Sequence, residues 1–249
     1  RLEGSEMCIR DSTETTPAIK GAPSSQTKDA VTDTGLSIRV PQFIEEGEKI
    51  DKLFVNPYGV NLKMFHPLPL ESDGYDIIFV GNWSLQKGVD ILVEACKKRG
   101  LSLLHVGAII DYAFPKQSKQ FCHVDPVNQP ELVYFYSKAK IFCLPSRQDG
   151  FGLVLFQAMI CGLPLVYSHY TGGPDLKKLV NDHEFLFEMP EYTVESLSET
   201  LLKALKKAEQ QPRNCVRSYL TEDAVSNISW QAYGQRYNCL LYTSDAADD

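Results

Sequence analysis

The sequence has no apolar run near the roughly 18–20 residues that a membrane-spanning helix needs, so a transmembrane helix is excluded. It has no excess of basic residues either, because 25 lysines and arginines stand against 32 acidic residues and give a net charge of −7. Nucleic-acid-binding proteins need a basic face, so we expect no nucleic-acid partner. Residues 1–30 lack the apolar core of a signal peptide, and we expect a cytoplasmic protein.

Several familiar motifs are also missing. The seven cysteines include no CxxC pair, and most of them lie in apolar runs. This pattern favours buried, reduced thiols over disulfides or zinc ligands. Neither the GxGxxG nor the Walker signature of nucleotide-binding loops occurs.

From residue 37 onward, short apolar runs alternate with segments of helical periodicity. Strands are predicted at 52–56, 76–80, 102–106, 121–124, 141–144, 164–167 and 184–187, and helices over 89–96, 128–139, 153–161, 175–180 and 194–205. Strands with few polar residues are typical of sheets that are buried on both faces. The sequence therefore predicts an α/β fold with a Rossmann-like, mostly parallel sheet and helices on both faces.

One loop of this pattern could bind an anion. Residues 145–152 lead from a strand directly into a helix and contain Gly150 and Gly152, whose lack of a side chain allows a ligand to approach the backbone. The amides of Phe151, Gly152 and Leu153 would then face an anion at the positive end of the helix dipole. A diphosphate is the expected ligand, and a plain strand–helix turn is the alternative.

The segment from Pro145 to Pro164 resembles the signature of family-4 glycosyltransferases, which have the GT-B fold. Further segments resemble motifs of that family in the same order: 56–65, Gly81-Asn82 with Lys87-Gly88, Gly172-Gly173-Pro174-Asp175, and Ser229-Trp230. The likeness covers residues 38–237. By this resemblance the chain is identified as a carboxy-terminal, nucleotide-sugar-binding domain.

The resemblance implies roles for individual residues. Asp149 would face the hydroxyls of the donor sugar, and Lys87 would bind the diphosphate and stabilise it as it leaves, so both are predicted to be catalytic. Gln157 would reach the ribose of the nucleotide. The other predicted binding residues are Gly81, Asn82, Gly150, Phe151, Gly152 and Leu153. A retaining, metal-independent reaction is also implied, with a nucleotide-sugar as substrate and no cofactor.

Three positions depart from the family pattern. Asp149 is one methylene shorter than the usual glutamate, and Asn82 stands where an arginine often pairs with the phosphates. Gln157 replaces a carboxylate, and neutral hydrogen bonds are about half as strong as ionic ones. These changes predict weaker donor affinity or a different nucleotide. They also leave open an alternative, a non-catalytic nucleotide-binding or regulatory module with a decayed glycosyltransferase site.

The chain divides into unequal parts. Residues 1–12 and 239–249 resemble a translated sequencing adapter read from its two strands, so both segments are expected artefacts. Residues 13–36 are polar and are expected to be disordered or a poorly assembled leader. Residues 37–65 are expected to be the end of an amino-terminal domain with the interdomain linker, and 66–238 the nucleotide-sugar-binding domain.

The amino-terminal acceptor-binding domain is then the missing partner. We expect the full-length parent to be a glycosyltransferase of hexosyltransferase type that acts on a glycan, a lipid or a small molecule. This fragment alone should bind the donor weakly and transfer nothing, because a GT-B site lies between two domains.

Other polar residues have simpler interpretations. His105 lies within an apolar strand run and is predicted to be a core histidine rather than a catalyst. Lys203, Lys206 and Lys207 predict a solvated helix face, with a peripheral membrane contact to a lipid-linked acceptor as the alternative.

Overall fold

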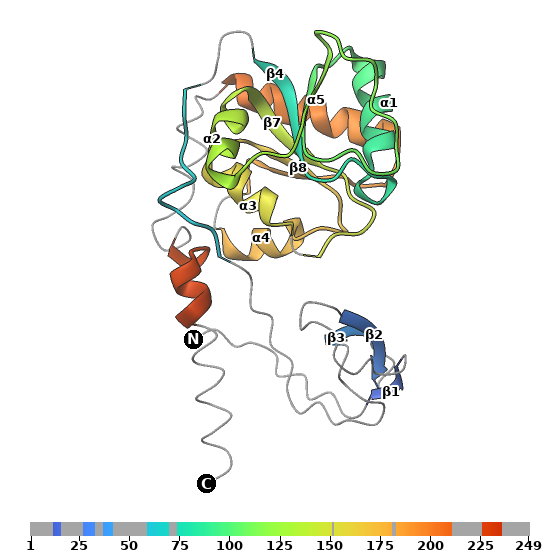
Figure 1. Cartoon of the computed structure of the whole chain (residues 1–249), viewed down its shortest axis with the longest axis vertical. Coiled ribbons are helices and arrows are strands. Elements are labelled where there is room, and N and C mark those ends of the chain that lie inside the picture. The colour runs from blue at the N-terminus through green and yellow to red at the C-terminus, as the bar shows by residue number, and fades with distance from the viewer. Residues whose placement is uncertain are drawn as a thin grey trace. The chain divides into compact units, whose positions relative to one another are not determined.

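The structure is a computed structural model. It describes residues 12–15, 27–32, 37–41, 59–69, 74–150, 152–180, 183–210 and 226–235. The chain forms two compact units, residues 1–55 and 56–249 (Figure 1).

The first unit contains a three-stranded antiparallel sheet in the order β1-β2-β3. Its strands are β1 (Ser12–Thr15), β2 (Thr27–Thr32) and β3 (Ser37–Pro41). β2 and most of β1 lie within residues 13–36, the segment expected to be disordered or a poorly assembled leader. The sequence of β2 is polar, but it contains Val31 and two threonines, and such β-branched residues favour extended backbone.

The second unit is built on a six-stranded, fully parallel sheet in the order β6-β5-β4-β7-β8-β9. The strands are β4 (Tyr75–Val80), β5 (Leu103–Val106), β6 (Phe121–Val124), β7 (Ala139–Leu144), β8 (Leu165–Tyr167) and β9 (Leu186–Glu188). The helices are η1 (Leu85–Lys87), α1 (Val89–Arg99), α2 (Gln129–Ser137), α3 (Leu153–Ile160), α4 (Gly173–Leu179) and α5 (Val194–Gln210). This architecture confirms the predicted α/β fold.

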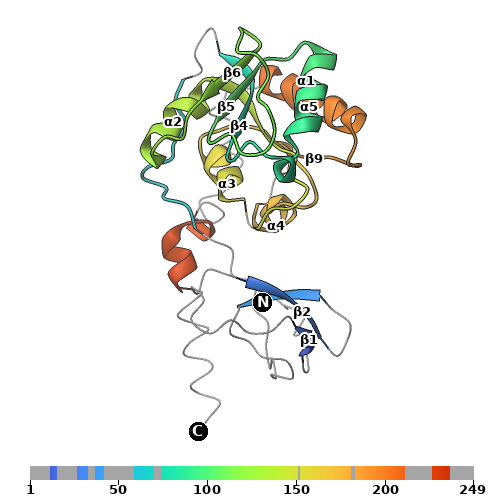
Figure 2. The same ribbon diagram turned by 45° about the vertical axis from the view of Figure 1, so that its right-hand side comes forward.

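Helices cover both faces of this sheet. α1 and α5 lie side by side against one face, and α2 and α3 cover the other (Figures 1 and 2). The central strands are buried from both sides, so Ile77, Ile78 and Phe79 of β4 have no exposed surface. Burying such a side chain contributes roughly 1.5–3 kcal/mol to stability, which explains why these strands read as continuous apolar runs.

Most element predictions are confirmed to within two residues. Helix α2 begins after Asn128 as expected, with Pro130 in its first turn, and the Glu131 carboxylate accepts a hydrogen bond from the Asn128 amide at 2.9 Å. The predicted strand at 52–56 lies outside the described residues. The described cysteines are free thiols, as predicted: Cys96, Cys143 and Cys161 are buried and Cys122 is half-buried.

Candidate functional site

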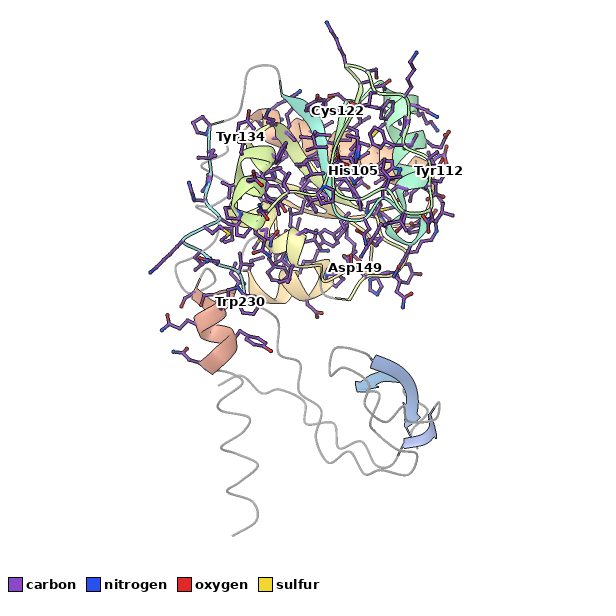
Figure 3. The ribbon with its side chains drawn as sticks, viewed as in Figure 1. His105, Tyr112, Cys122, Tyr134, Asp149 and Trp230 are labelled. Carbon is purple, nitrogen blue, oxygen red and sulfur yellow. The ribbon has the colours of Figure 1, made fainter. Side chains whose placement is uncertain are left out.

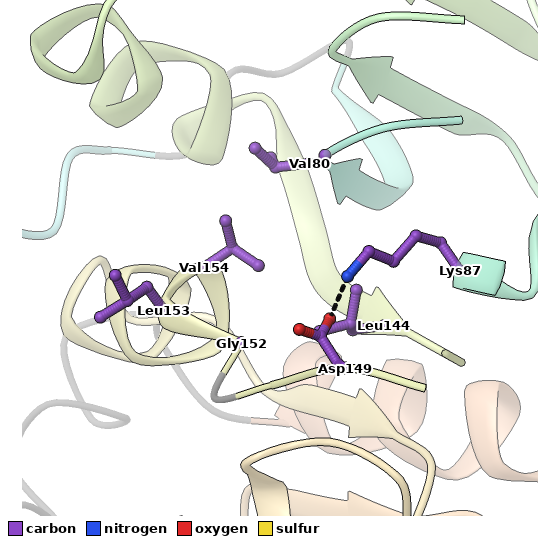
Figure 4. Close-up of a pocket in the computed structure, with 8 residues that line it drawn as sticks. Val80, Lys87, Leu144, Asp149, Gly152, Leu153 and Val154 are labelled. Carbon is purple, nitrogen blue, oxygen red and sulfur yellow. Dashed lines mark hydrogen bonds and ion pairs between the residues drawn. The ribbon is translucent and has the colours of Figure 1, made fainter. Parts of the chain in front are cut away.

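A cavity lies where the winding of the sheet reverses. β4 and β7 are parallel neighbours, but the helix after β4 packs on one face and the helix after β7 on the other. The loops that follow the two strands diverge around a cavity of about 420 Å³ (Figure 4). Open α/β sheets bind ligands at such a point. The lining residues are Val80, Gly81, Lys87, Leu144, Asp149, Gly152, Leu153 and Val154.

Lys87 and Asp149 form an ion pair in this cavity. Lys87 Nζ, from the end of η1, lies 2.7 Å from Asp149 Oδ2, from the β7–α3 loop (Figure 4). Their side chains are 22% and 11% exposed, so the pair is shielded but open to a ligand. Ser146 Oγ also donates to Asp149 Oδ2, at 3.4 Å. The other carboxylate oxygen of Asp149 has no hydrogen-bond partner among the described residues.

Arg147 joins the loops that carry these two side chains. Its guanidinium donates to both carboxylate oxygens of Asp90, at 2.6 and 2.7 Å, and to the Leu85 carbonyl oxygen at 2.6 Å. Its own amide donates to the Gln86 carbonyl oxygen at 2.8 Å. Hydrogen bonding from Arg147 lowers the pKa of Asp90. Arg147 therefore fixes the separation of the two loops, a role that sequence analysis did not identify.

The start of α3 forms one wall of the cavity. Gly152 is its cap, with a left-handed φ of 65°, and the first turn carries no acidic residue. The first amides of a helix have no partner within the helix, so this wall offers donors and a positive dipole end to an anion. Gly152 and Leu153 line the cavity, whereas Gly150 is exposed outside the lining. Phe151 lies outside the described residues.

The opposite wall is the turn after β4. Gly81 lines the cavity with a positive φ of 138°, and a Cβ atom there would meet nothing within 4 Å. Its amide donates to the Val106 carbonyl oxygen at 3.0 Å, which extends the ladder between β4 and β5. Asn82 follows it, and the residue is exposed and not part of the lining.

Gln157 lies apart from the cavity. The residue is 6% exposed, and its Oε1 accepts a hydrogen bond at 3.2 Å from the hydroxyl of Tyr136, on the neighbouring α2. Burial raises the pKa of that hydroxyl, so Tyr136 stays a neutral donor. The structure thus brings Lys87, Asp149, Gly81, Gly152 and Leu153 together around the cavity, and Gln157 is not part of the lining.

His105 is buried with no exposed surface, which confirms it as a core residue (Figure 3). Its Nε2 lies 2.9 Å from the Gly81 carbonyl oxygen, and its Nδ1 lies 2.9 Å from His123 Nδ1. Burial lowers the pKa of His105 to about 4, so the ring is neutral near pH 7. The position of His105 in the strand predicted the burial but could not reveal the contact with Gly81.

Three further predictions concern metal ions, membranes and the lysines of α5. Within the described residues, no three histidine, cysteine or acidic side chains are grouped so that they could hold a metal ion. No helix in the described part of the chain has both the length and the apolar character to cross a membrane. Of the three lysines predicted to form a solvated face of α5, Lys203 and Lys206 are exposed, whereas Lys207 is half-buried and forms an ion pair with Glu184.

Two protein families match separate parts of the chain. Residues 61–218 match the family described as glycosyl transferases group 1. Residues 11–51 match the family described as elongation factor P, C-terminal, in the unit that carries β1, β2 and β3. The two matches do not overlap.

Curated relatives of the chain include several glycosyltransferases. The chain is 27% identical over 167 residues to a D-inositol 3-phosphate glycosyltransferase of Paenarthrobacter aurescens (strain TC1), which covers 55% of this chain and 39% of that protein. It is 24% identical over 194 residues to the capsular polysaccharide biosynthesis glycosyltransferase CapM of Staphylococcus aureus, which covers 71% of this chain and 49% of CapM. The chain thus spans less than half the length of these relatives.

Two solved structures illustrate the structural similarity. Sucrose-phosphate synthase from Thermosynechococcus elongatus superposes with a TM-score of 0.55 and 22% identity, over 80% of this chain and 54% of that one. HepE of Anabaena, in complex with UDP-glucose, gives a TM-score of 0.57 and 17% identity, over 74% and 56% of the two chains. Because the match to glycosyl transferases group 1 spans more than half of the sequence, the chain belongs to that family, and its α/β unit has the fold of the GT-B carboxy-terminal domain.

Proposed function

We propose that the α/β unit binds the donor for a retaining, metal-independent glycosyltransferase that moves a sugar from a nucleotide-sugar to an acceptor. The observation that carries the proposal is the Lys87–Asp149 pair, held in a cavity against the start of α3. A cation and a helix end on one side suit a diphosphate, and a carboxylate with a free oxygen suits sugar hydroxyls.

In this scheme, Lys87 and the amides at the start of α3 bind the diphosphate and stabilise it as the bond to the sugar breaks. Asp149 accepts hydrogen bonds from the sugar through its free oxygen, and Lys87 turns partly from the carboxylate to reach the phosphates. The lysine stem allows this rotation, and its point charge serves either partner. The acceptor is held by an amino-terminal domain of the parent protein.

Known structures suggest which donors to test. HepE has been solved with UDP, with UDP and glucose, and with UDP-glucose, and starch synthase IV of Arabidopsis thaliana with ADP and acarbose. We therefore propose UDP- and ADP-sugars as the first candidates, with GDP-sugars as the third.

Calorimetric titration of the chain with UDP-, ADP- and GDP-glucose tests the proposal. One donor should bind, and Lys87→Met should weaken it ten- to a hundredfold, the effect of losing a hydrogen bond to a charged group. Lys140→Met is the matched control, because Lys140 forms a similar 2.8 Å pair with Asp76 at the other edge of the sheet. Equal losses in both variants, or no binding by the wild type, would count against the proposal. Equal affinity for the nucleotide and its sugar conjugate would favour a non-catalytic module.

The proposed ribose contact of Gln157 needs a separate test, because Gln157 is bonded to Tyr136. If the contact exists, Gln157→Glu should change nucleotide-sugar affinity, and Tyr136→Phe should strengthen binding by freeing the amide oxygen. If neither variant differs from the wild type, Gln157 has no such role.

A further inference from the structure

The backbone at Gly81 and Asn82 has a fixed orientation. The amides of Gly81 and Trp83 both point toward β5, where they donate to the carbonyl oxygens of Val106 at 3.0 Å and Ala108 at 2.7 Å. Because these two amides, two residues apart, point the same way, the alternation of a strand continues through Gly81 despite its positive φ. The intervening amide of Asn82 therefore points toward β7, the side on which the cavity lies. Among the described residues, none accepts a hydrogen bond from it.

The same conclusion follows from the carbonyl of this peptide. The bond between Gly81 and Asn82 is trans, so its C=O and N–H groups point in opposite directions. The carbonyl oxygen of Gly81 is turned inward, 2.9 Å from His105 Nε2. Gly107 leaves room for it, since a Cβ atom at that position would lie 2.1 Å from this oxygen. Turning the peptide over would break the His105 contact and point the Asn82 N–H inward at the His105 ring, without an acceptor.

The hydrogen bonds of the two histidines determine their tautomers. The Gly81 oxygen can only accept, so His105 Nε2 carries the proton and donates to it. His105 Nδ1 is then an acceptor, and His123 Nδ1 must donate to it across 2.9 Å. His123 is stacked on His105 with ring centroids 4.8 Å apart, and its Nε2 faces Asp125 at 3.5 Å. His123 Nδ1 carries a proton whether the ring is neutral or charged. One assignment of the ring protons therefore satisfies both hydrogen bonds.

We propose that His105, oriented by His123, is a positioning residue that holds the Gly81–Asn82 peptide so that the Asn82 amide donates to a phosphate in the cavity. The inference rests on the proposed donor function, and it names a phosphate contact that side-chain identity does not reveal. The backbone amide of Asn82 would also supply a hydrogen-bond donor at a position where the side chain carries no charge.

Nuclear magnetic resonance of the ¹⁵N-labelled chain tests the arrangement without any ligand. Ring nitrogen shifts should show His105 protonated at Nε2 and His123 at Nδ1. A His105 ring protonated at Nδ1 alone would overturn the proposal, because the bond to Gly81 would then be absent.

Titration with UDP, ADP and GDP tests the phosphate contact. The Asn82 amide proton should move downfield with the diphosphate that binds, and His105→Phe should abolish that movement and weaken affinity five- to tenfold. His105→Gln, whose amide can still donate to Gly81, should restore most of the affinity. Phe114→Leu is the matched control, because Phe114 stacks on His105 with centroids 5.7 Å apart but does not contact Gly81.

The outcomes separate the two proposals. If the wild type binds none of the three diphosphates, the donor function fails, while the ring tautomers still test the arrangement. If a diphosphate binds and His105→Phe keeps both the affinity and the Asn82 shift, the positioning role is wrong and the donor function stands. Circular dichroism and the melting temperature of each variant check that it is folded.

Discussion

Two lysine–aspartate pairs lie at opposite edges of the same sheet. Lys140 and Asp76, at the amino edge, are 2.8 Å apart, and Lys87 and Asp149, at the carboxyl edge, are 2.7 Å apart. Both pairs are partly shielded from solvent. The two pairs differ in the other hydrogen bonds that each carboxylate accepts. This difference distinguishes a pair with a structural role from a pair that can also bind a ligand.

At the amino edge, both oxygens of the carboxylate are occupied. Asp76 Oδ1 accepts from Lys140, and Oδ2 accepts from the amide and hydroxyl of Ser102 at 2.9 and 3.0 Å. Burial raises the pKa of Asp76, but these hydrogen bonds outweigh it and the net pKa is lowered. At the carboxyl edge, Lys87 and Ser146 share one oxygen of Asp149. The other oxygen is available to a ligand.

The largest expected effect concerns the contact between loops at the carboxyl edge. Gly88 and Gly100 are both left-handed helix caps, with φ of 72° and 66°. A Cβ atom at Gly88 would lie 2.0 Å from the Pro145 carbonyl oxygen, whereas one at Gly100 would meet nothing within 4 Å. Gly88→Ala should cost about 4 kcal/mol of unfolding free energy and Gly100→Ala about 1 kcal/mol. Urea denaturation measures both, and similar losses would show that the loops can separate freely.

The buried His105 ring should give the next largest effect on stability, through the pH dependence of the unfolding free energy. Its pKa is lowered to about 4 in the folded chain, against about 6.5 when unfolded, so the unfolded state takes up a proton first as the pH falls. The stability that it contributes is complete above pH 6.5 and is lost between pH 6.5 and 4, by roughly 3 kcal/mol. His105→Phe should flatten this part of the stability–pH curve, and His66→Gln, at an exposed histidine, should not. An unchanged slope in His105→Phe would contradict the burial argument.

Replacing each of the two aspartates by asparagine should lower the unfolding free energy by a smaller amount, and by a different amount at each position. An asparagine has one acceptor oxygen, so Asp76→Asn must lose either Lys140 or Ser102, at a cost of about 2 kcal/mol. Asp149→Asn can keep both of its donors on one oxygen and should cost less than about 1 kcal/mol. Acid should weaken the wild type further as the pH falls through the lowered pKa of Asp76, below its usual 3.8. Equal losses of unfolding free energy at neutral pH would remove the distinction between the edges.

Much of the fold could be predicted because its signals are local. The apolar runs of β4 and β7 are bounded by turn residues, and Asn128 begins α2 with its own capping pattern. The strands β1, β2 and β3 were missed. Polar residues dominate β1 and β2, and only pairing reveals such strands.

The site was predictable as a set of loops but not as a set of contacts. Lys87 and Asp149 are 62 residues apart, and only the neighbouring positions of β4 and β7 bring them to 2.7 Å. The contact of Gln157 with a ribose stays a prediction. Its hydrogen bond to Tyr136 of α2 could not be predicted, because the face of a helix that meets the core depends on its neighbours. The contact between His105 and Gly81 likewise depends on the register of β4 and β5.

The smallest expected effect on stability is at Arg147, and it sharpens the comparison most. The Arg147–Asp90 pair is 40% and 27% exposed, so Arg147→Ala should cost less than about 1 kcal/mol of unfolding free energy. Lys98→Ala, which breaks a pair with Glu195 on the outer surface of α1 and α5, should cost a similar amount. Donor affinity should nevertheless fall severalfold in Arg147→Ala alone, because Arg147 holds the loops that carry Lys87 and Asp149. If both variants bind the donor with the affinity of the wild type, the loops keep their separation without Arg147. The carboxyl edge of the sheet would then not depend on this residue for its geometry.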